Sequence, residues 1–114
     1  MIAVIFEVMP HPDRKQDYLD MAAQMRPLVE QIDGFISVER FQSLTNPDKL
    51  LSLSFFRDEE ALNEWRRLSQ HRSAQKAGRN VFFADYRLRI AHVMRDYGMT
   101  DREEAPADSK ALHG

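Results

Sequence analysis

The sequence predicts a single α+β domain in which two amphipathic helices cover one face of an antiparallel sheet. Apolar residues follow a two-residue period along several short segments, recur at helical spacing along two others, and are separated by turn-forming residues. The chain has 114 residues, which suits one domain with one core. In order, the segments are a strand, a helix, two strands, a helix and a strand.

The first strand and the first helix come from the N-terminal third of the chain. Residues 2–8 are apolar on both faces until Glu7, as expected for a strand that is covered on both sides. Asp13 and Gln16 have the spacing of a capping box, so the helix is expected to begin there. Apolar residues then recur at helical spacing, and Pro27 among them predicts a kink or a division of the helix.

Glycine and proline mark the boundaries in the middle of the chain. Gly34 ends the first helix, and strands are predicted at residues 35–43 and 50–56. The turn around Pro47 joins these strands, so they should pair as an antiparallel hairpin. A second helix follows, with negative charge in its first turn and an apolar stripe that includes Trp65.

The last part of the chain contains a long strand and a polar tail. Residues 69–79 are expected to be irregular, and residues 81–97 form the longest alternating segment. Because strands usually have about three to ten residues, the far end of this one is predicted to pair with a second copy of the chain. Residues 98–114 lack apolar periodicity and are expected to form a flexible tail outside the domain of residues 1–97.

The order β-α-β-β-α-β predicts a ferredoxin-like fold with both helices on one face of the sheet. The apolar residues of the other face would then form a large exposed patch, which two chains remove by packing their sheets face to face. We therefore expect a homodimer in the form of an α+β barrel.

Composition argues against several classes of partner and site. The chain has 16 basic and 18 acidic residues, and its net charge of −2 gives no field that would attract nucleic acid or an anionic membrane. Cysteine is absent, which excludes disulfides and thiolate sites and is compatible with the cytoplasm. No apolar stretch approaches the roughly 18 to 20 residues of a membrane helix, so a soluble protein is expected. Scattered histidines make a metal site unexpected.

Several short motifs follow one another in a distinctive order. They are Phe56-Arg57-Asp58-Glu59-Glu60-Ala61-Leu62-Asn63-Glu64-Trp65, His71-Arg72, Asp85-Tyr86-Arg87-Leu88 and Met94-Arg95-Asp96-Tyr97, preceded by the opening strand and the joint Asp33-Gly34-Phe35. In this order and spacing, residues 1–97 resemble the antibiotic biosynthesis monooxygenase (ABM) family. The resemblance implies a dimeric α+β barrel with a pocket between the sheet and the helices of each subunit. Members oxidise polycyclic aromatic molecules with dioxygen alone, degrade haem or isomerise substrates, so the fold does not determine the reaction.

The resemblance and the residue chemistry suggest candidate site residues. Trp65 matches a tryptophan that lines the pocket of the family's oxygenases, where it could stack on a flat ligand; on an apolar stripe it could equally be core packing. His71 could take a proton or bind iron, or it could lie at the surface near the helix end. The further candidates for contact with a substrate are Asn63, Tyr86, Arg40 and Ser37, although alternation alone does not say which strand face is inside.

These expectations give one preferred function and two alternatives. The preferred function is a monooxygenase without metal or flavin that buries a small aromatic or quinol-like molecule, helps it to ionise and lets the anion reduce dioxygen. The second is a haem-binding or haem-degrading monooxygenase; in such relatives the first strand carries an asparagine, where this chain has Phe6, Glu7 and Val8. The third is a dimer that binds a small molecule without catalysis.

Overall fold

The computed structural model describes residues 1–74 and 82–114, and of residues 70–74 it describes the backbone only. The strands are β1 (Ile2–Pro10), β2 (Phe35–Gln42), β3 (Leu50–Phe56) and β4 (Phe83–His92). The helices are α1 (Lys15–Val29), preceded by the 3₁₀ turn η1 (Pro12–Arg14), α2 (Glu59–Ala74) and α3 (Ala107–His113). Within these ranges, no helix is long and apolar enough to cross a membrane.

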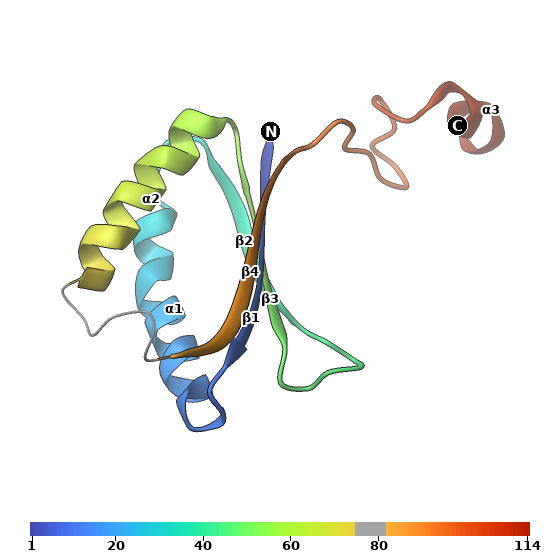
Figure 1. Ribbon diagram of the computed structural model, residues 1–114. Helices are drawn as coiled ribbons and strands as arrows, with labels where there is room; N and C mark the ends of the chain where they lie inside the picture. Colours follow the sequence, from blue (N-terminus) through green and yellow to red (C-terminus); the bar gives the residue numbers. More distant parts are fainter. Residues whose placement is uncertain (75–81) are drawn as a thin grey trace.

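The four strands form one antiparallel sheet in the order β2-β3-β1-β4. Helices α1 and α2 lie on the same side of this sheet, and in the part of the chain that the structure describes no element covers the opposite side (Figure 1). This arrangement confirms the predicted α+β ferredoxin-like fold. We call the side beneath the helices the inner face and the opposite side the outer face.

Alternation along the strands assigns the side chains to these two faces. In β1, Val4 and Phe6 point toward the helices, whereas Ile5 and Glu7 point to the outer face. Leu53 of β3 lies opposite Ile5 in the strand register and therefore also belongs to the outer face. Both faces of the central strands are thus largely apolar, as the sequence of the first strand predicts.

The buried core of the inner face consists of two separate clusters. The first cluster joins both helices to the sheet and contains Ile2, Val29, Phe56, Ala61 and Leu62. The second cluster lies by the start of α1 and contains Val8, Tyr18 and Leu50. Neither cluster fills the middle of the inner face, so a space remains between them.

Gly34 lets the start of α2 approach the end of α1. Its φ of +92° is a left-handed conformation that glycine adopts without steric cost. A Cβ atom at this position would lie 2.8 Å from the Cβ of Ala61. The turn before α2 provides an N-cap for this helix, because the Asp58 carboxylate accepts a hydrogen bond from the backbone N–H of Ala61 at 2.9 Å. This bond, together with the neighbouring Arg57, holds the pKa of Asp58 below its ordinary value.

The first two helices differ in detail from the sequence prediction. The predicted capping box is wrong: the start of α1 has no side-chain cap, and Gln16 donates to Asp20 at 2.9 Å instead of reaching back. Pro27 does not divide α1; it lies in the last turn of the helix, which continues to Val29. Helix α2 continues to Ala74 through part of the segment that was expected to be irregular.

Strand β4 is shorter than the predicted segment of residues 81–97. It ends at His92, and all of it lies along β1, from Phe83 opposite Pro10 to His92 opposite Ile2. The alternating pattern continues beyond His92, and no described strand of the chain pairs with this continuation; beside the end of the ladder the backbone N–H of Val93 donates to the carbonyl of Met1 at 3.0 Å. Pairing of the far end with a second copy of the chain stays a prediction.

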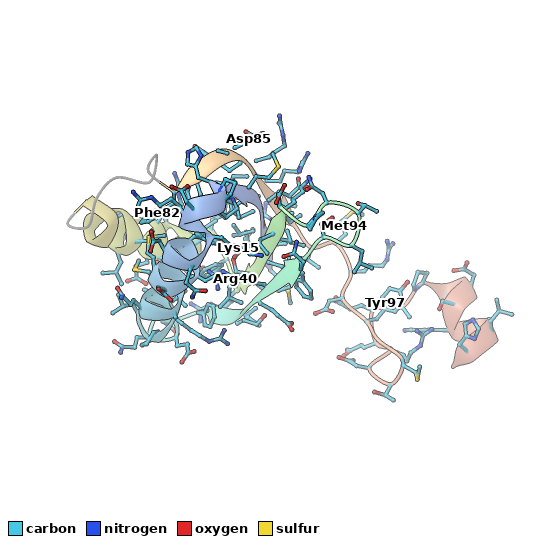
Figure 2. All side chains as sticks on the ribbon, turned by 90° about the horizontal axis from the view of Figure 1, so that it is seen from below. Lys15, Arg40, Phe82, Asp85, Met94 and Tyr97 are labelled. Atoms are coloured by element: carbon cyan, nitrogen blue, oxygen red, sulfur yellow. The ribbon has the colours of Figure 1, made fainter. Side chains whose placement is uncertain are left out.

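Residues 93–114 leave the sheet as an arm, along which Met94 and Tyr97 lie before α3 (Figure 2). The side chain of Arg102 organises the arm, because it lies over the ring of Tyr97 and donates three hydrogen bonds of 2.5 to 3.1 Å. Their acceptors are the carbonyl oxygens of Gly98 and Gly114 and the hydroxyl of Ser109. The arm thus contains local structure that periodicity did not indicate, and its flexibility stays a prediction.

Candidate functional site

A cavity of about 290 Å³ lies on the inner face between the sheet and the two helices. It occupies the space between the two core clusters, because its lining takes Val29 and Leu62 from the first and Tyr18 from the second. Most of the other lining residues are aliphatic, aromatic or methionine side chains. A mostly apolar cavity near 300 Å³ has the size and character of a site for a small molecule.

The cavity is less covered on the side of β4. The inner-face residues of this strand, Tyr86, Leu88 and Ile90, remain 54%, 49% and 47% exposed. Leu88 and Ile90 also line the cavity. Among the described elements, the helices therefore leave the β4 edge of the inner face partly uncovered.

Trp65 lies on the side of α2 that faces the sheet. Its half-buried ring packs against the first core cluster and also lines the cavity. Both interpretations from the sequence thus have a structural counterpart, since one ring contributes to the core and to the cavity wall. A role in substrate binding or catalysis stays a prediction.

Arg40 on β2 points into the same cavity because of an irregularity in the strand. The register of β2 shifts between Phe35 and Ser37, so that Val38 and Arg40 line the cavity whereas Ser37 lies on the outer face. The Nε of Arg40 donates to the Tyr18 hydroxyl at 3.4 Å, and its Cζ lies 5.8 Å from the centre of that ring. Tyr18 is 3% exposed.

Tyr18 is a site residue that sequence reasoning missed. It is the first residue of the apolar stripe of α1, and its spacing in that stripe does not distinguish it from a core residue. The one available signal was chemical, because a tyrosine on a buried stripe carries a hydroxyl that needs a polar neighbour. Arg40 is that neighbour.

The polar part of the cavity wall is cationic. Three guanidinium groups, those of Arg26, Arg40 and Arg66, contribute to the lining, and no carboxylate does among the described residues. Arg26 is exposed and paired with Glu30 at 3.0 Å, and Arg66 is also exposed. Arg40 is half-buried, with the nearly buried hydroxyl of Ser52 opposite it in the register. This wall favours a ligand that is neutral or negatively charged.

The other predicted site residues are placed elsewhere. Asn63 is exposed on α2 and does not line the cavity. Tyr86 packs beside two rings of the cavity region, with ring centroids 5.6 and 5.9 Å away, but is not itself part of the lining. Ser37 lies on the outer face, and the side chain of His71 is outside the described residues. Where side chains are described, no group of three or more His, Cys, Asp or Glu residues could hold a metal ion.

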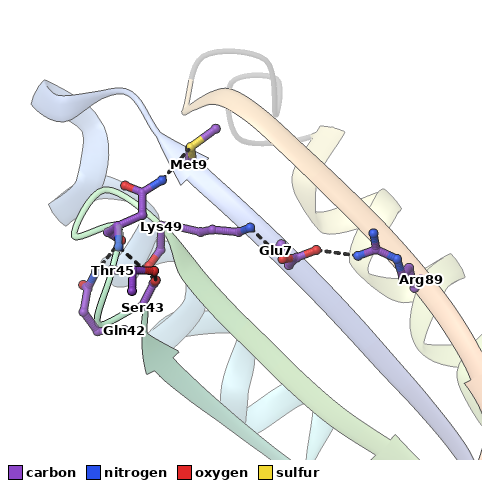
Figure 3. Close-up of polar contacts among 8 residues, drawn as sticks. Glu7, Met9, Gln42, Ser43, Thr45, Lys49 and Arg89 are labelled. Atoms are coloured by element: carbon purple, nitrogen blue, oxygen red, sulfur yellow. Dashed lines mark hydrogen bonds and ion pairs between the residues drawn. The ribbon is translucent and has the colours of Figure 1, made fainter.

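The outer face carries a charged group (Figure 3), near which Ile5, Phe41 and Leu51 also lie. Glu7 of β1 lies between Lys49, which precedes β3, and Arg89 of β4. The Lys49 ammonium lies 2.7 Å from one oxygen of Glu7, and the Arg89 guanidinium pairs with the other. The hydrogen bond from Lys49, followed by that from Arg89, holds the pKa of Glu7 below its ordinary value.

Solved structures share this fold at low sequence identity. Rv0793 from Mycobacterium tuberculosis has a TM-score of 0.72 at 18% identity, over 85% of this chain and 98% of that one. MhuD with manganese protoporphyrin IX bound has a TM-score of 0.70 at 15% identity, over 86% of this chain and 99% of that one. At these identities the similarity supports the fold and says nothing of the ligand.

Sequence comparison is more specific. The chain is 46% identical over 93 residues to the jasmonate monooxygenase ABM of Pyricularia oryzae. The match covers 82% of this chain but only 43% of that relative, so the chain spans less than half of the relative's length. The family model described as antibiotic biosynthesis monooxygenase matches residues 1–77, well over half of the chain. The fold, the cavity beside Trp65 and this match together show that the chain belongs to the antibiotic biosynthesis monooxygenase (ABM) family.

Proposed function

We propose that this chain is a monooxygenase that encloses a small, apolar, oxidisable molecule in the cavity of the inner face. The observation that carries the proposal is the cavity itself, which is largely apolar and includes Trp65 and Arg40 in its wall. An aromatic or quinol-like molecule fits this description. A compact molecule of the kind named for the Pyricularia oryzae relative, jasmonate, is a second candidate.

Such a cavity suits an oxidation that uses neither metal nor flavin. A substrate with an acidic C–H group loses a proton, and the electron-rich anion then reduces dioxygen. One oxygen atom enters the substrate as a carbonyl and the other leaves as water, so that R₂CH₂ and O₂ give R₂C=O and H₂O. Apolar walls limit the access of water, and the guanidinium of Arg40 stabilises negative charge as it develops. The described lining contains no carboxylate or imidazole to take the proton, so His71 stays the candidate base.

Oxygen uptake tests this function. The purified chain is mixed under ¹⁸O₂ with a hydroquinone, an anthrone and jasmonate, and oxygen consumption and product mass are recorded. We expect substrate-dependent uptake, with one ¹⁸O atom per product molecule for the anthrone or jasmonate, which have the acidic CH₂ group that this step needs. Trp65→Ala should lower kcat/KM about tenfold or more, whereas Trp65→Phe retains a ring and should lose less. Arg67→Met, which changes an exposed residue of α2 outside the lining, is the matched control. Absence of uptake with all three substrates would favour the non-catalytic alternative.

Haem binding is the enzymatic alternative, and the described part of the cavity wall contains no histidine to support it. Titration with haemin separates the two functions. Under our proposal no Soret band develops beyond that of free haemin. A band that His71→Ala abolishes would instead establish haem as the ligand.

We further propose that two copies associate through their outer faces to form the α+β barrel. In the described ranges this face has no cover (Figure 1), and burial of Ile5, Leu53 and Phe55 against a second sheet removes their apolar surface from water. Glu7 already has cationic partners within the chain, so its own burial would not leave an isolated carboxylate. A reducing cytoplasm is the expected location, since the chain has no cysteine.

A further inference from the structure

Arg40 differs from the other two arginines of the cavity wall. Arg26 is exposed and has Glu30 as its ion-pair partner, and Arg66 is exposed to solvent. Arg40 is half-buried, and among the described residues no carboxylate pairs with it. A guanidinium that is partly withdrawn from water without a counter-ion has lost hydration that the described residues replace only in part. An anionic ligand would replace it.

The donors around Arg40 suit a carboxylate. Its Nε makes the contact of 3.4 Å with Tyr18, while its two terminal nitrogens have no hydrogen-bond partner within the described residues. These nitrogens form a planar fork that matches the two oxygens of a carboxylate. Because the Tyr18 oxygen accepts from Arg40, its O–H is free to donate to the same anion. The hydroxyl of Ser52 lines the same wall.

This group of donors and Trp65 belong to different parts of the cavity wall. Tyr18 is a member of the second core cluster, whereas Trp65 packs against the first, and the cavity extends between the two. Arg40 lies on the inner face beside the start of α1 (Figure 2). A ligand whose charged end is bound at Arg40 would therefore extend its apolar part toward Trp65.

We propose that the substrate is a small apolar carboxylic acid, whose carboxylate binds to Arg40 and Tyr18 while its apolar part fills the cavity beside Trp65. This inference rests on the proposed function, because it concerns the same cavity, and it narrows the substrate class from apolar molecules to apolar monocarboxylates. Arg40 is then the residue that determines specificity for the charged group.

The fluorescence of Trp65 provides the test, because it is the single tryptophan of the chain and it lines the cavity. The chain is titrated under nitrogen, so that no oxidation occurs, with jasmonate, decanoate and the methyl ester of each. Each acid should bind about tenfold to a hundredfold more tightly than its ester, the range expected for a charge-assisted contact out of water. In Arg40→Met this preference should fall to about threefold or less, and Arg40→Lys should retain part of it.

Matched variants distinguish an anion site from a general loss of structure. Arg67→Met removes an exposed arginine of the same helix as Trp65 and should leave the preference for the acid unchanged. Tyr18→Phe keeps the buried ring and loses only the hydroxyl. It should weaken the binding of the acid more than the binding of the ester. Thermal melting of every variant shows whether it is folded.

The outcomes separate this inference from the proposed function. Any of three results would overturn the carboxylate site. They are equal affinity for acid and ester, no change in Trp65 fluorescence with any acid, and an equal loss of affinity for acid and ester in Arg40→Met. A preference for the acid without oxygen uptake by any acid would support the site and refute the monooxygenase. Equal rates of oxygen uptake with acid and ester would support the monooxygenase and refute the site.

Discussion

The two faces of the sheet are formed by the same strands, yet they differ in what covers them. Phe55 and Phe56 are neighbours in β3: Phe56 is 1% exposed in the first core cluster, whereas Phe55 is only half-buried on the outer face. The inner face is packed by side chains of its own chain around a cavity, in whose wall Arg40 contacts the Tyr18 hydroxyl and has no carboxylate partner among the described residues. The outer face lacks a described cover, and its central charge, Glu7, is already paired. Alternation along the strands thus puts the proposed ligand site and the proposed association surface on opposite faces of one sheet.

The largest effect should distinguish the two phenylalanines. Phe56→Ala should lower the free energy of unfolding by about 3 to 5 kcal/mol, because it leaves a cavity in a closed core. Phe55→Ala removes the same atoms from the outer face and should cost less than half of that in the monomer. Denaturant titrations at several protein concentrations measure both. Equal losses that do not depend on concentration would show that the two faces are packed alike.

A new charge on the outer face should weaken the association of two chains more than it destabilises the fold. Leu53→Arg places a large charged side chain between Ile5 and Glu39, its neighbours in the strand register, and should raise the dissociation constant of the dimer at least about a hundredfold, or about 2.7 kcal/mol. Sedimentation equilibrium should then report one chain at micromolar concentration, with native circular dichroism. Leu44→Arg, at a fully exposed position of the loop between β2 and β3, is the control and should remain dimeric. A parent chain that is folded and monomeric would refute the proposed barrel.

The smallest effect concerns the charged group of the outer face. The pKa of Glu7 is lowered from its ordinary 4.5, so its carboxylate stabilises the folded chain above that pH and loses this contribution as the pH falls through the lowered value. Glu7→Gln should therefore reduce the melting temperature at neutral pH, and the difference from the parent should shrink in acid. Melting curves at about pH 7 and about pH 3 test this. Glu64→Gln, at an exposed position of α2, should show a smaller difference at neutral pH; a pH-independent offset for Glu7→Gln would contradict the assignment.

The element order was predictable because the turn residues and the apolar periods agree along most of the chain. The strand ends were less predictable, because the end of a strand depends on its neighbour: β4 ends at His92, opposite the first residue of β1, although the alternating pattern continues. The segment after Leu68 lacks apolar periodicity, yet α2 continues to Ala74, since a helix that has already formed extends at little cost.

The candidate site was predictable only in part. Trp65 follows from its position in an apolar stripe, but the direction of Arg40 depends on the register shift after Phe35, which reverses the alternation that would otherwise group it with the outer face. The same shift places Ser37, the other candidate on β2, on the outer face. A two-residue period cannot locate such a shift without its partner strand.

The hydrogen bond that closes the end of β4 has a consequence for the architecture of longer chains. The backbone N–H of Val93 donates to the carbonyl of Met1 at 3.0 Å, so the beginning of β1 and the exit from β4 are adjacent at one corner of the sheet. A domain whose ends meet in this way can be duplicated in tandem, with the arm of residues 93–114 as a ready connection. Both halves of a barrel would then be covalently joined, and their assembly would no longer depend on protein concentration.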